Sequence, residues 1–308
     1  MLEEREILTA KKPTLLLRSS IMRAIRFFFE HEGFLEVQTP VRTPAPAPEP
    51  HIDAIPADGW FLSTSPELYM KRLLAAGYEK IFQLAPCFRR GERGRLHHPE
   101  FCLLEWYRLG SDYQTLKRDC LDLLRHISQA VNGSLKARYQ GSSLDLESGC
   151  QHITVREAFL HFAGWDPISS ADPDRFDLDL VEKVEPRLGF PMPCILSDYP
   201  PFQAALARLK PGDPTVAERF ELYWAGIELA NGFSELTDSR EQRERFLQAM
   251  EARSRQGRTV YPIAESFLAS IEHLPPCTGI ALGVDRLMMI FADAVQLDQV
   301  VAFPPDMA

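Results

Sequence analysis

Apolar residues recur at three- and four-residue spacing between residues 14 and 32, and this period predicts an amphipathic helix. Leu17 and Ile21 belong to its apolar face, and arginines lie between the apolar positions. Gly33 is a suitable C-cap, because glycine readily adopts the left-handed backbone conformation in which many helices end. The short run 34–37 then predicts a strand that leads into a proline-rich, semi-extended loop.

The next apolar runs predict strands. Residues 81–89 and 100–108 read as two strands joined by the polar stretch 90–99. A second hairpin is predicted over residues 220–230, where two apolar runs flank an Ala-Gly pair. The small residues of 279–283 predict one more strand near the end of the chain.

Two further helices have clear starting signals. Ser65 is a good N-cap, Pro66 suits the first helical position, and Glu67 complements the positive end of a helix. Asp238, with Glu241 three residues later, resembles a capping box for a helix that runs to about residue 254. Additional helices are predicted over residues 113–132 and 284–292.

The order of these elements indicates the fold class. Helices and strands do not alternate as they do in a parallel βαβ series, so a mainly antiparallel sheet with helices around it fits best. We therefore predict an α+β fold that forms one domain over residues 1–308. Residues 135–215 are rich in Pro, Asp and Gly and indicate little about chemistry.

Composition narrows the class of protein. The chain is 45% hydrophobic and 25% charged, and no stretch approaches the roughly 20 consecutive apolar residues that a membrane span needs. Its polar start does not resemble a signal peptide, so we expect a cytoplasmic protein without a membrane partner. The net charge of −9 argues against nucleic-acid binding as the main role of the protein. The six cysteines lack zinc-ligand spacing and are expected to be buried reduced thiols.

One predicted strand carries an unusual set of side chains. Because side chains alternate across a strand, Phe101, Leu103, Glu105 and Tyr107 share one face. A carboxylate buried there without a partner would be costly, so Glu105 should face a cation or solvent. Arg89 ends the preceding strand, which would place an anion-binding arginine on the same surface. Periodicity alone leaves open a solvent-facing sheet with ordinary charges.

Five segments in series resemble the catalytic core of class II lysyl-tRNA synthetases and their paralogues, over residues 14–303. The FR…HxPEF hairpin and the glycine-rich segment that ends in arginine are the most specific of them. The resemblance implies a class II synthetase-like antiparallel sheet flanked by helices, and activation of an amino acid with ATP and Mg²⁺. The segments are FEHEGFLEVQTP, STSPELYMKRL, FQLAPCFRRGERGRLHHPEFCLLEWYRL, FELYWAGIELANGFSEL and TGIALGVDRLMMIF.

The resemblance also implies roles for the matching positions. Arg89 would contact the α-phosphate and Arg286 the γ-phosphate, as the two catalytic residues, and Glu221 and Glu228 would hold Mg²⁺. The implied ATP-binding residues are Arg89, Glu92, His98, Phe101, Glu228, Leu229, Gly283 and Arg286. The implied substrate-binding residues are Ser65, Glu67, Glu105, Tyr107, Glu235 and Ala281, with Glu67 at the amino group near the carboxylate and Glu105, Tyr107 and Glu235 around the distal ammonium.

These residue types suit the implied chemistry. Attack of a carboxylate on the α-phosphate needs positioned cations rather than a covalent nucleophile. A dicationic substrate needs several carboxylates, which a neutral amino acid would leave buried and unpaired. The family usually shows Arg-x-Glu where this chain has Arg89-Arg90-Gly91, so either Glu92 substitutes through a shifted loop or ATP binding is weakened. No residue is an obvious general base for transfer of the activated amino acid.

Two features resemble the β-lysine ligase branch of this family. About 13 residues precede the first predicted helix, too few for the anticodon-binding domain of lysyl-tRNA synthetases. Ala281 stands where those synthetases generally have glycine. The resemblance implies (R)-β-lysine as the activated substrate and a lysine side chain of elongation factor P as its acceptor. It also implies a homodimer with segment 34–40 at the interface, and makes tRNA an unexpected partner.

Two alternatives stay open. A truncated synthetase would charge tRNA or another RNA with lysine, and a cluster of arginines and histidines in the hairpin loop could contact that RNA. A degenerate paralogue that has lost the Arg-x-Glu carboxylate would bind an amino acid or a partner without catalysis. Against the latter, the catalytic arginines and the metal-binding glutamates are all present. The arginines and histidines of the hairpin-loop cluster are Arg90, Arg93, Arg95, His97 and His98.

Overall fold

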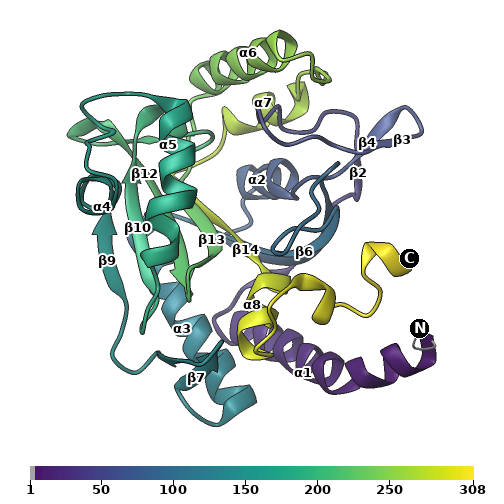
Figure 1. Cartoon of the computed structure of the whole chain (residues 1–308). Helices are drawn as coiled ribbons and strands as arrows, with labels where there is room; N and C mark the ends of the chain where they lie inside the picture. Colours follow the sequence, from purple (N-terminus) through teal and green to yellow (C-terminus); the bar gives the residue numbers. More distant parts are fainter. Residues whose placement is uncertain (1–3) are drawn as a thin grey trace.

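The computed structural model describes residues 4–308, and a large sheet forms its centre (Figure 1). Nine strands make this sheet, in the order β1-β5-β6-β14-β13-β12-β10-β9, with β11 paired to β12 outside that path. Its strands are β1 (Leu35–Glu36), β5 (Lys80–Phe88), β6 (Glu100–Leu109), β9 (Gln151–Thr154), β10 (Cys194–Tyr199), β11 (Leu209–Lys210), β12 (Asp213–Trp224), β13 (Ile227–Ser234) and β14 (Cys277–Gly283).

Antiparallel pairing dominates this sheet, which confirms the predicted fold class. The two parallel pairs, β1 with β5 and β9 with β10, lie at its two ends. In the middle, Glu105 of β6 lies opposite Gln83 of β5 and Ala281 of β14. The hairpins predicted over residues 81–108 and 220–230 are both confirmed.

The two faces of the central strands meet different surroundings. Phe82, Leu104 and Trp106 belong to the main hydrophobic core, which helices α1, α3 and α8 cover (Figure 1). The residues between them, including Glu105 and Tyr107, point to the opposite face, on the side of α2 and α7. The helices are α1 (Glu4–His31), α2 (Glu67–Ala75), α3 (Tyr113–Asn132), α4 (Val155–Phe162), α5 (Pro173–Asp179), α6 (Ser239–Arg255), α7 (Glu265–Ile271) and α8 (Val284–Phe291).

Smaller elements complete the molecule. A three-stranded sheet in the order β2-β4-β3 lies near α2, and β7 pairs with β8. These strands are β2 (Arg42–Thr43), β3 (Pro56–Ala57), β4 (Trp60–Leu62), β7 (Lys136–Tyr139) and β8 (Ser142–Asp145). Short helical turns cover Leu180–Val184, Glu185–Arg187, Pro201–Gln203, Leu297–Gln299 and Pro305–Met307.

The observed ends of the helices show where the sequence signals alone were enough to predict a helix boundary. Helix α3 has its predicted limits, with Asp112 as N-cap and the left-handed Gly133 as C-cap. Asp238 caps α6 as predicted by accepting from two backbone N–H groups, but Glu241 pairs with Arg245 instead of completing a capping box. Ser65 accepts the Glu67 backbone N–H at 3.1 Å, although the N-cap position of α2 is Pro66.

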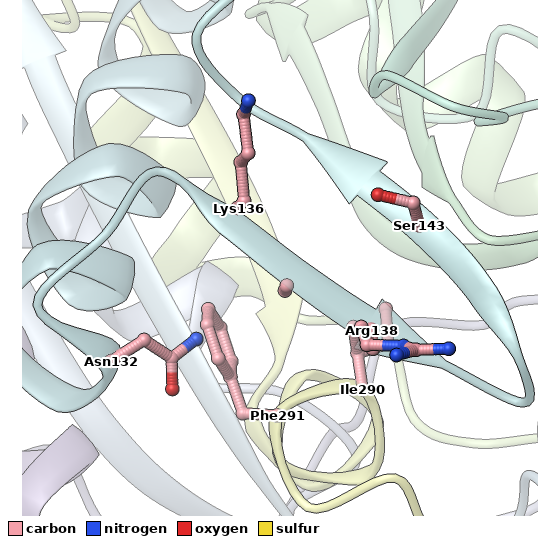
Figure 2. A pocket seen from close by; sticks show the side chains of 7 residues that line it. Asn132, Lys136, Arg138, Ser143, Ile290 and Phe291 are labelled. Atoms are coloured by element: carbon pink, nitrogen blue, oxygen red, sulfur yellow. The ribbon is translucent and has the colours of Figure 1, made fainter.

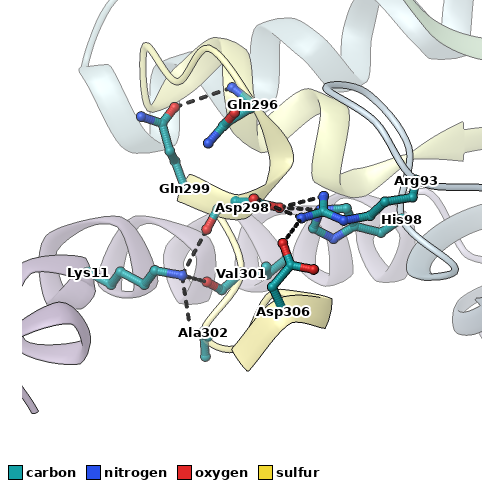
Figure 3. A network of polar contacts seen from close by, with 9 residues as sticks. All are labelled: Lys11, Arg93, His98, Gln296, Asp298, Gln299, Val301, Ala302 and Asp306. Carbon is teal, nitrogen blue, oxygen red and sulfur yellow. Dashed lines mark hydrogen bonds and ion pairs between the residues drawn. The ribbon is translucent and has the colours of Figure 1, made fainter. Parts of the chain in front are cut away.

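Helix α1 begins ten residues before its predicted start and continues through Pro13. The cause is a long-range contact that attaches the first turns to the C-terminal segment (Figure 3). There the Nζ atom of Lys11 donates to the carbonyls of Asp298 at 2.8 Å, Val301 at 2.8 Å and Ala302 at 3.2 Å.

Within residues 4–308, no helix has the length and apolar character required to cross a membrane.

Candidate active site

A cluster of buried carboxylates lies on the α2 side of the sheet. Glu105 projects from β6 and is fully buried. One of its oxygens accepts the Ser65 hydroxyl at 2.6 Å, and the other accepts the Tyr107 hydroxyl at 2.7 Å. Glu67, at the start of α2, and Glu235, directly after β13, complete the cluster. The structure thus brings together five predicted substrate residues, which we call the ammonium cage: Ser65, Glu67, Glu105, Tyr107 and Glu235.

A lysine that the sequence analysis missed lies inside the cage. Lys71 of α2 is 1% exposed, and its Nζ atom lies 2.6 Å from Glu67 and 2.5 Å from the fully buried Glu235. The spacing of Lys71 four residues after Glu67 on one helix was the signal that would have indicated this pair. A protein ammonium therefore bridges two of the carboxylates that are predicted to receive a substrate ammonium.

The cage shifts the protonation of its members. Burial, with the Glu67 charge adding to it, raises the pKa of Glu105 to about 8. Burial also raises the pKa of Glu235 to about 8, although Lys71 acts in the opposite direction. Burial by itself would lower the pKa of Lys71, but Glu235 and Glu67 outweigh it, so that this pKa is raised. The cage thus holds a permanent cation and two carboxyl groups whose pKa values are raised to about 8.

Gly279 of β14 makes the cage possible. A Cβ atom at this position would lie 2.1 Å from the Tyr107 ring and 2.3 Å from a carboxylate oxygen of Glu235. Both distances are far inside van der Waals contact, so any side chain here would displace one of the two residues. The strand therefore carries glycine where the phenol and the carboxylate approach the backbone.

A pocket of about 200 Å³ is lined by Ala281, which lies opposite Glu105 in the sheet, and we call it the nucleotide pocket after the ATP-binding residues predicted there. The Arg89 guanidinium lies 5.0 Å from the centre of the Phe101 ring, and its NH1 atom is 3.8 Å from Glu92. The Nε atom of Arg89 is buried and has no acceptor within the described part of the chain, as expected of a group that awaits an anion. The predicted residues lining this pocket are Arg89, Glu92, His98, Phe101, Glu228, Leu229, Ala281, Gly283 and Arg286.

Arg286 crosses the nucleotide pocket from the start of α8. Its NH1 atom donates to the Glu228 carbonyl at 2.9 Å and to the Glu228 carboxylate at 3.0 Å. Its NH2 atom lies 2.7 Å from Nε2 of His97, and burial together with the Arg286 charge lowers the pKa of His97. A neutral His97 can therefore accept from Arg286. His97 was not among the predicted ATP-binding residues, and only its place beside His98 in the sequence pointed to it.

His98 lines the nucleotide pocket, but its side chain is bound by Asp298, which lies outside the pocket. Its Nε2 atom lies 2.7 Å from Asp298, which also forms two contacts with Arg93 at 2.9 and 3.1 Å (Figure 3). Arg93 reaches Asp306 as well, at 2.7 Å. The loop between β5 and β6 is thus attached to the C-terminal segment through Arg93 and His98.

The two glutamates expected to hold Mg²⁺ lie on β12 and β13. Glu221 accepts from Tyr199 at 2.6 Å, Arg219 at 2.6 Å and Tyr223 at 2.5 Å. Burial and the charge of Glu228 raise the pKa of Glu221, whereas the cations around Glu228, with Arg286 foremost, overcome burial and lower the pKa of that residue.

This arrangement fits the binding mode typical of Mg²⁺. The residues 4–308 contain no group of three or more potential ligands placed to hold a metal ion. Magnesium, however, is usually bound by one or two carboxylates together with substrate phosphates and water. The charge of Glu228 acts on Glu221, and Glu228 pairs with Arg286, so these two carboxylates could supply that protein share. The cation would add the charge neutralisation that a triphosphate requires.

A second hollow, of about 390 Å³, lies where β7 and β8 meet the end of α3 and α8 (Figure 2). Lys136 and Arg138 project from β7, and Phe291 closes one side. None of the predicted site residues lines it. The chemistry therefore concentrates in the ammonium cage and the nucleotide pocket.

Comparison with known proteins agrees with this geometry. The model of the family "tRNA synthetases class II (D, K and N)" matches residues 8–307. The chain is 41% identical over 318 residues to the elongation factor P–(R)-beta-lysine ligase of Pectobacterium carotovorum, and the match covers 97% of both proteins. It is 39% identical to the ligase of the same name from Klebsiella pneumoniae, with 97% of each covered, and 38% identical to that from Vibrio cholerae, with 96% of each covered.

Proposed function

The chain belongs to the class II tRNA synthetase family (D, K and N), and on that premise we propose that it activates (R)-β-lysine with ATP and transfers it to a lysine side chain of elongation factor P. The match to ligases of that name over almost the whole of both chains supports this assignment. Family membership and these relatives make the protein an ATP-dependent ligase.

The ammonium cage is the observation that carries the choice of substrate. Glu67, Glu105 and Glu235 supply three negative charges when ionised, and Lys71 supplies one positive charge, which leaves two negative charges. A diamino acid brings two ammonium groups and so neutralises the cage. A neutral amino acid would leave buried charge without a partner, at a cost of several kcal/mol.

Each residue then has a task in the activation step. The cage fixes the two ammonium groups and leaves the substrate carboxylate at the border with the nucleotide pocket. Arg89 neutralises the α-phosphate that this carboxylate attacks, Phe101 stacks on adenine, and Arg286 holds the γ-phosphate. Bond formation between the carboxylate and the α-phosphorus releases pyrophosphate and leaves the aminoacyl adenylate bound. Fixed cations stabilise the charge that develops, without a covalent enzyme intermediate.

The test is ATP–pyrophosphate exchange with purified protein, Mg²⁺ and one amino acid at a time. We expect exchange with (R)-β-lysine to exceed exchange with L-α-lysine, and no exchange with norleucine, which lacks the distal ammonium. Incubation with elongation factor P should then yield a covalent adduct visible by mass spectrometry. Preference for α-lysine would favour the RNA-charging alternative, and the absence of exchange with every diamino acid would favour a non-catalytic paralogue.

Ala281 offers a finer test of substrate choice. It lies opposite Glu105 in the sheet and lines the nucleotide pocket, so its methyl group is close to where the two sites meet. We propose that this methyl group favours the β-amino acid. The Ala281→Gly variant should lose about 5- to 150-fold of the preference for β-lysine over α-lysine, which corresponds to about 1–3 kcal/mol.

The RNA-charging alternative loses support from the hairpin loop. Arg93 and His98 belong to the cluster that could contact nucleic acid, yet both are engaged by Asp298. We further propose a homodimer in the cytoplasm, where its acceptor would be made and used. Leu35 of the edge strand β1 is 51% exposed, which suits an interface at segment 34–40. Sedimentation of the Leu35→Asp variant would test that dimer.

A further inference from the structure

One carboxylate in the site has no task in the reaction described so far. Glu49 lies in the proline-rich loop between β2 and β3 and lines the nucleotide pocket together with Arg89 and Phe101. The charged groups that act on its carboxyl are Arg89 and Glu92, from the end of β5 and its loop, Glu67 of α2 and Arg219 of β12. Glu49 thus faces the nucleotide pocket and the ammonium cage at once.

Hydrogen bonds from α6 hold the backbone of the loop that contains Glu49. Arg253 of α6 is fully buried, and its NH1 atom donates to the carbonyls of Glu49 at 2.6 Å and Ile52 at 2.7 Å. Its NH2 atom pairs with Asp53 at 2.5 Å. Within the described residues, no hydrogen bond or ion pair engages the Glu49 carboxylate itself, although the residue is partly buried. The main chain is held in place while the carboxylate is left available.

Under the proposed function, the reacting carbonyl of the adenylate lies between two of the charged groups that act on Glu49. Its phosphate would lie at Arg89, and the amino group near its carbonyl would lie at Glu67. The carbonyl carbon connects these two groups, so it falls between the two residues whose charges act on Glu49 most directly. An acceptor amine that attacks this carbon therefore passes within reach of the Glu49 carboxylate.

We propose that Glu49 is the general base of the transfer step, an inference that rests on the proposed function. The acceptor lysine first loses one proton to solvent and becomes a neutral amine. Its nitrogen attacks the adenylate carbonyl carbon, and a C–N bond forms. The C–O bond to AMP breaks, and its electron pair leaves with the phosphate. The second proton passes from the amine nitrogen to a carboxylate oxygen of Glu49, so the products are an amide, AMP and a protonated Glu49.

The environment of Glu49 favours this task. Burial raises the pKa of its carboxyl, Arg89 and Arg219 oppose that shift, and Glu67 and Glu92 reinforce it. A base whose pKa lies closer to the working pH transfers protons more effectively than an ordinary glutamate. Because the pKa is raised, Glu49 takes up its proton at a higher pH than an ordinary glutamate does, and transfer should slow more than adenylate formation as pH falls.

The experiment separates transfer from activation. The Glu49→Gln variant should lose far less of its ATP–pyrophosphate exchange with (R)-β-lysine than of its transfer activity, and circular dichroism and thermal melting check that it is folded. Single-turnover transfer from the preformed adenylate to elongation factor P should fall by about 100-fold or more. Formate should partly restore transfer in the Glu49→Ala variant, because a small carboxylate can occupy the vacated space. Hydroxylamine is a much weaker base than a lysine amine, so after attack its nitrogen loses a proton readily to water. Its reaction with the adenylate should therefore fall much less than transfer in the variant.

Three results would overturn the inference. Transfer at the normal rate in Glu49→Gln would exclude a base at this position. Parallel losses of exchange and transfer, with a raised KM for β-lysine, would make Glu49 a ligand of the amino acid instead. Absence of exchange in the unaltered enzyme would overturn the proposed function and this inference with it, and that result is seen before any variant is made.

Discussion

The ammonium cage and the nucleotide pocket contain the same kinds of charged side chain at different depths. In the cage, the side chains of Glu235 and Lys71 are 0% and 1% exposed. In the nucleotide pocket, those of Arg286 and Glu228 are 18% and 33% exposed. Each site contains an ion pair within the protein, but water reaches the second pair and is excluded from the first.

This difference assigns separate tasks to the two sites. An uncompensated charge in a buried site costs several kcal/mol, so the cage can reject a ligand that lacks an ammonium. Partly exposed pairs contribute much less, so those in the nucleotide pocket can exchange their partners for phosphates at small cost. Under the proposed function, the buried site would therefore choose the amino acid, and the exposed site would bind ATP.

The largest expected effect comes from neutralising a cage carboxylate. Glu235→Gln removes one partner of a buried pair, a change that typically costs about 3–5 kcal/mol. We expect kcat/KM for β-lysine in the exchange assay to fall by roughly 100-fold or more. The KM for ATP should change little. Equal losses in both parameters would show that the two sites do not act separately.

A smaller effect is expected from removing the internal cation. Lys71→Met leaves three carboxyl groups in the cage without a counter-charge, and we expect the free energy of unfolding to fall by about 3 kcal/mol. The double variant Lys71→Met/Glu235→Gln should recover part of this loss, because it also removes one of the charges left without a partner. Urea unfolding of both variants measures the difference. A double variant less stable than the sum of the two single changes would contradict the assigned pairing.

The pH dependence should differ between the two sites. Glu105 and Glu235 have pKa values raised to about 8, so between about pH 4.5 and 8 the folded enzyme binds more protons than the unfolded chain. Their contribution to the stability of the empty enzyme is full below about pH 4.5 and is lost as pH rises through 8. Substrate ammonium groups favour the ionised carboxylates, so the KM for β-lysine should fall from pH 7 to 9 by about tenfold for each of the two groups, or up to about 100-fold in total.

A variant that lacks one of the two titrating carboxyl groups is the control for this pH dependence. Glu105→Gln removes one of the two titrating groups and should flatten this pH profile, even though it raises the KM at every pH. The KM for ATP should show no matching change over pH 7 to 9. A profile that is unchanged in Glu105→Gln would assign the titration to other groups.

The smallest effect is expected from the matched change in the nucleotide pocket. Glu92→Gln makes the same chemical substitution as Glu235→Gln, at a side chain that is 27% exposed and 3.8 Å from Arg89. We expect the KM for ATP to rise only several-fold, because an exposed pair contributes about 0–1 kcal/mol. Measured beside Glu235→Gln, it isolates the effect of burial. A hundredfold effect would instead show that Glu92 replaces the family's Arg-x-Glu carboxylate in full.

The placement of several cage residues could be predicted from local rules, whereas the choice of the five residues as a substrate site came from the family resemblance. The alternation of side chains along a strand placed Glu105 and Tyr107 on one face, and the structure confirms that arrangement. The sequence signals at Ser65 and Glu67 located the start of α2 within one residue. For these positions, the neighbours along the chain decide where each side chain points.

Other features depend on contacts that no local pattern records. Lys71 enters the cage because β13 brings Glu235, 164 positions later, against α2. The first turns of α1 persist through Pro13 because Lys11 contacts the C-terminal segment. Glu49 lies in a loop that periodicity cannot place, and a buried arginine from α6 determines its position. In each case the missing information is the partner, which tertiary packing supplies.

Gly279 also sets a limit on any attempt to redesign the enzyme for another amino acid. Every one of the other nineteen residues would introduce an atom within 2.3 Å of the cage, so a randomised library gains nothing at this position. Two residues along the same strand, Ala281 borders the open pocket, and its side chain can change in size. Directed evolution of new substrate ranges should therefore keep position 279 fixed and diversify position 281.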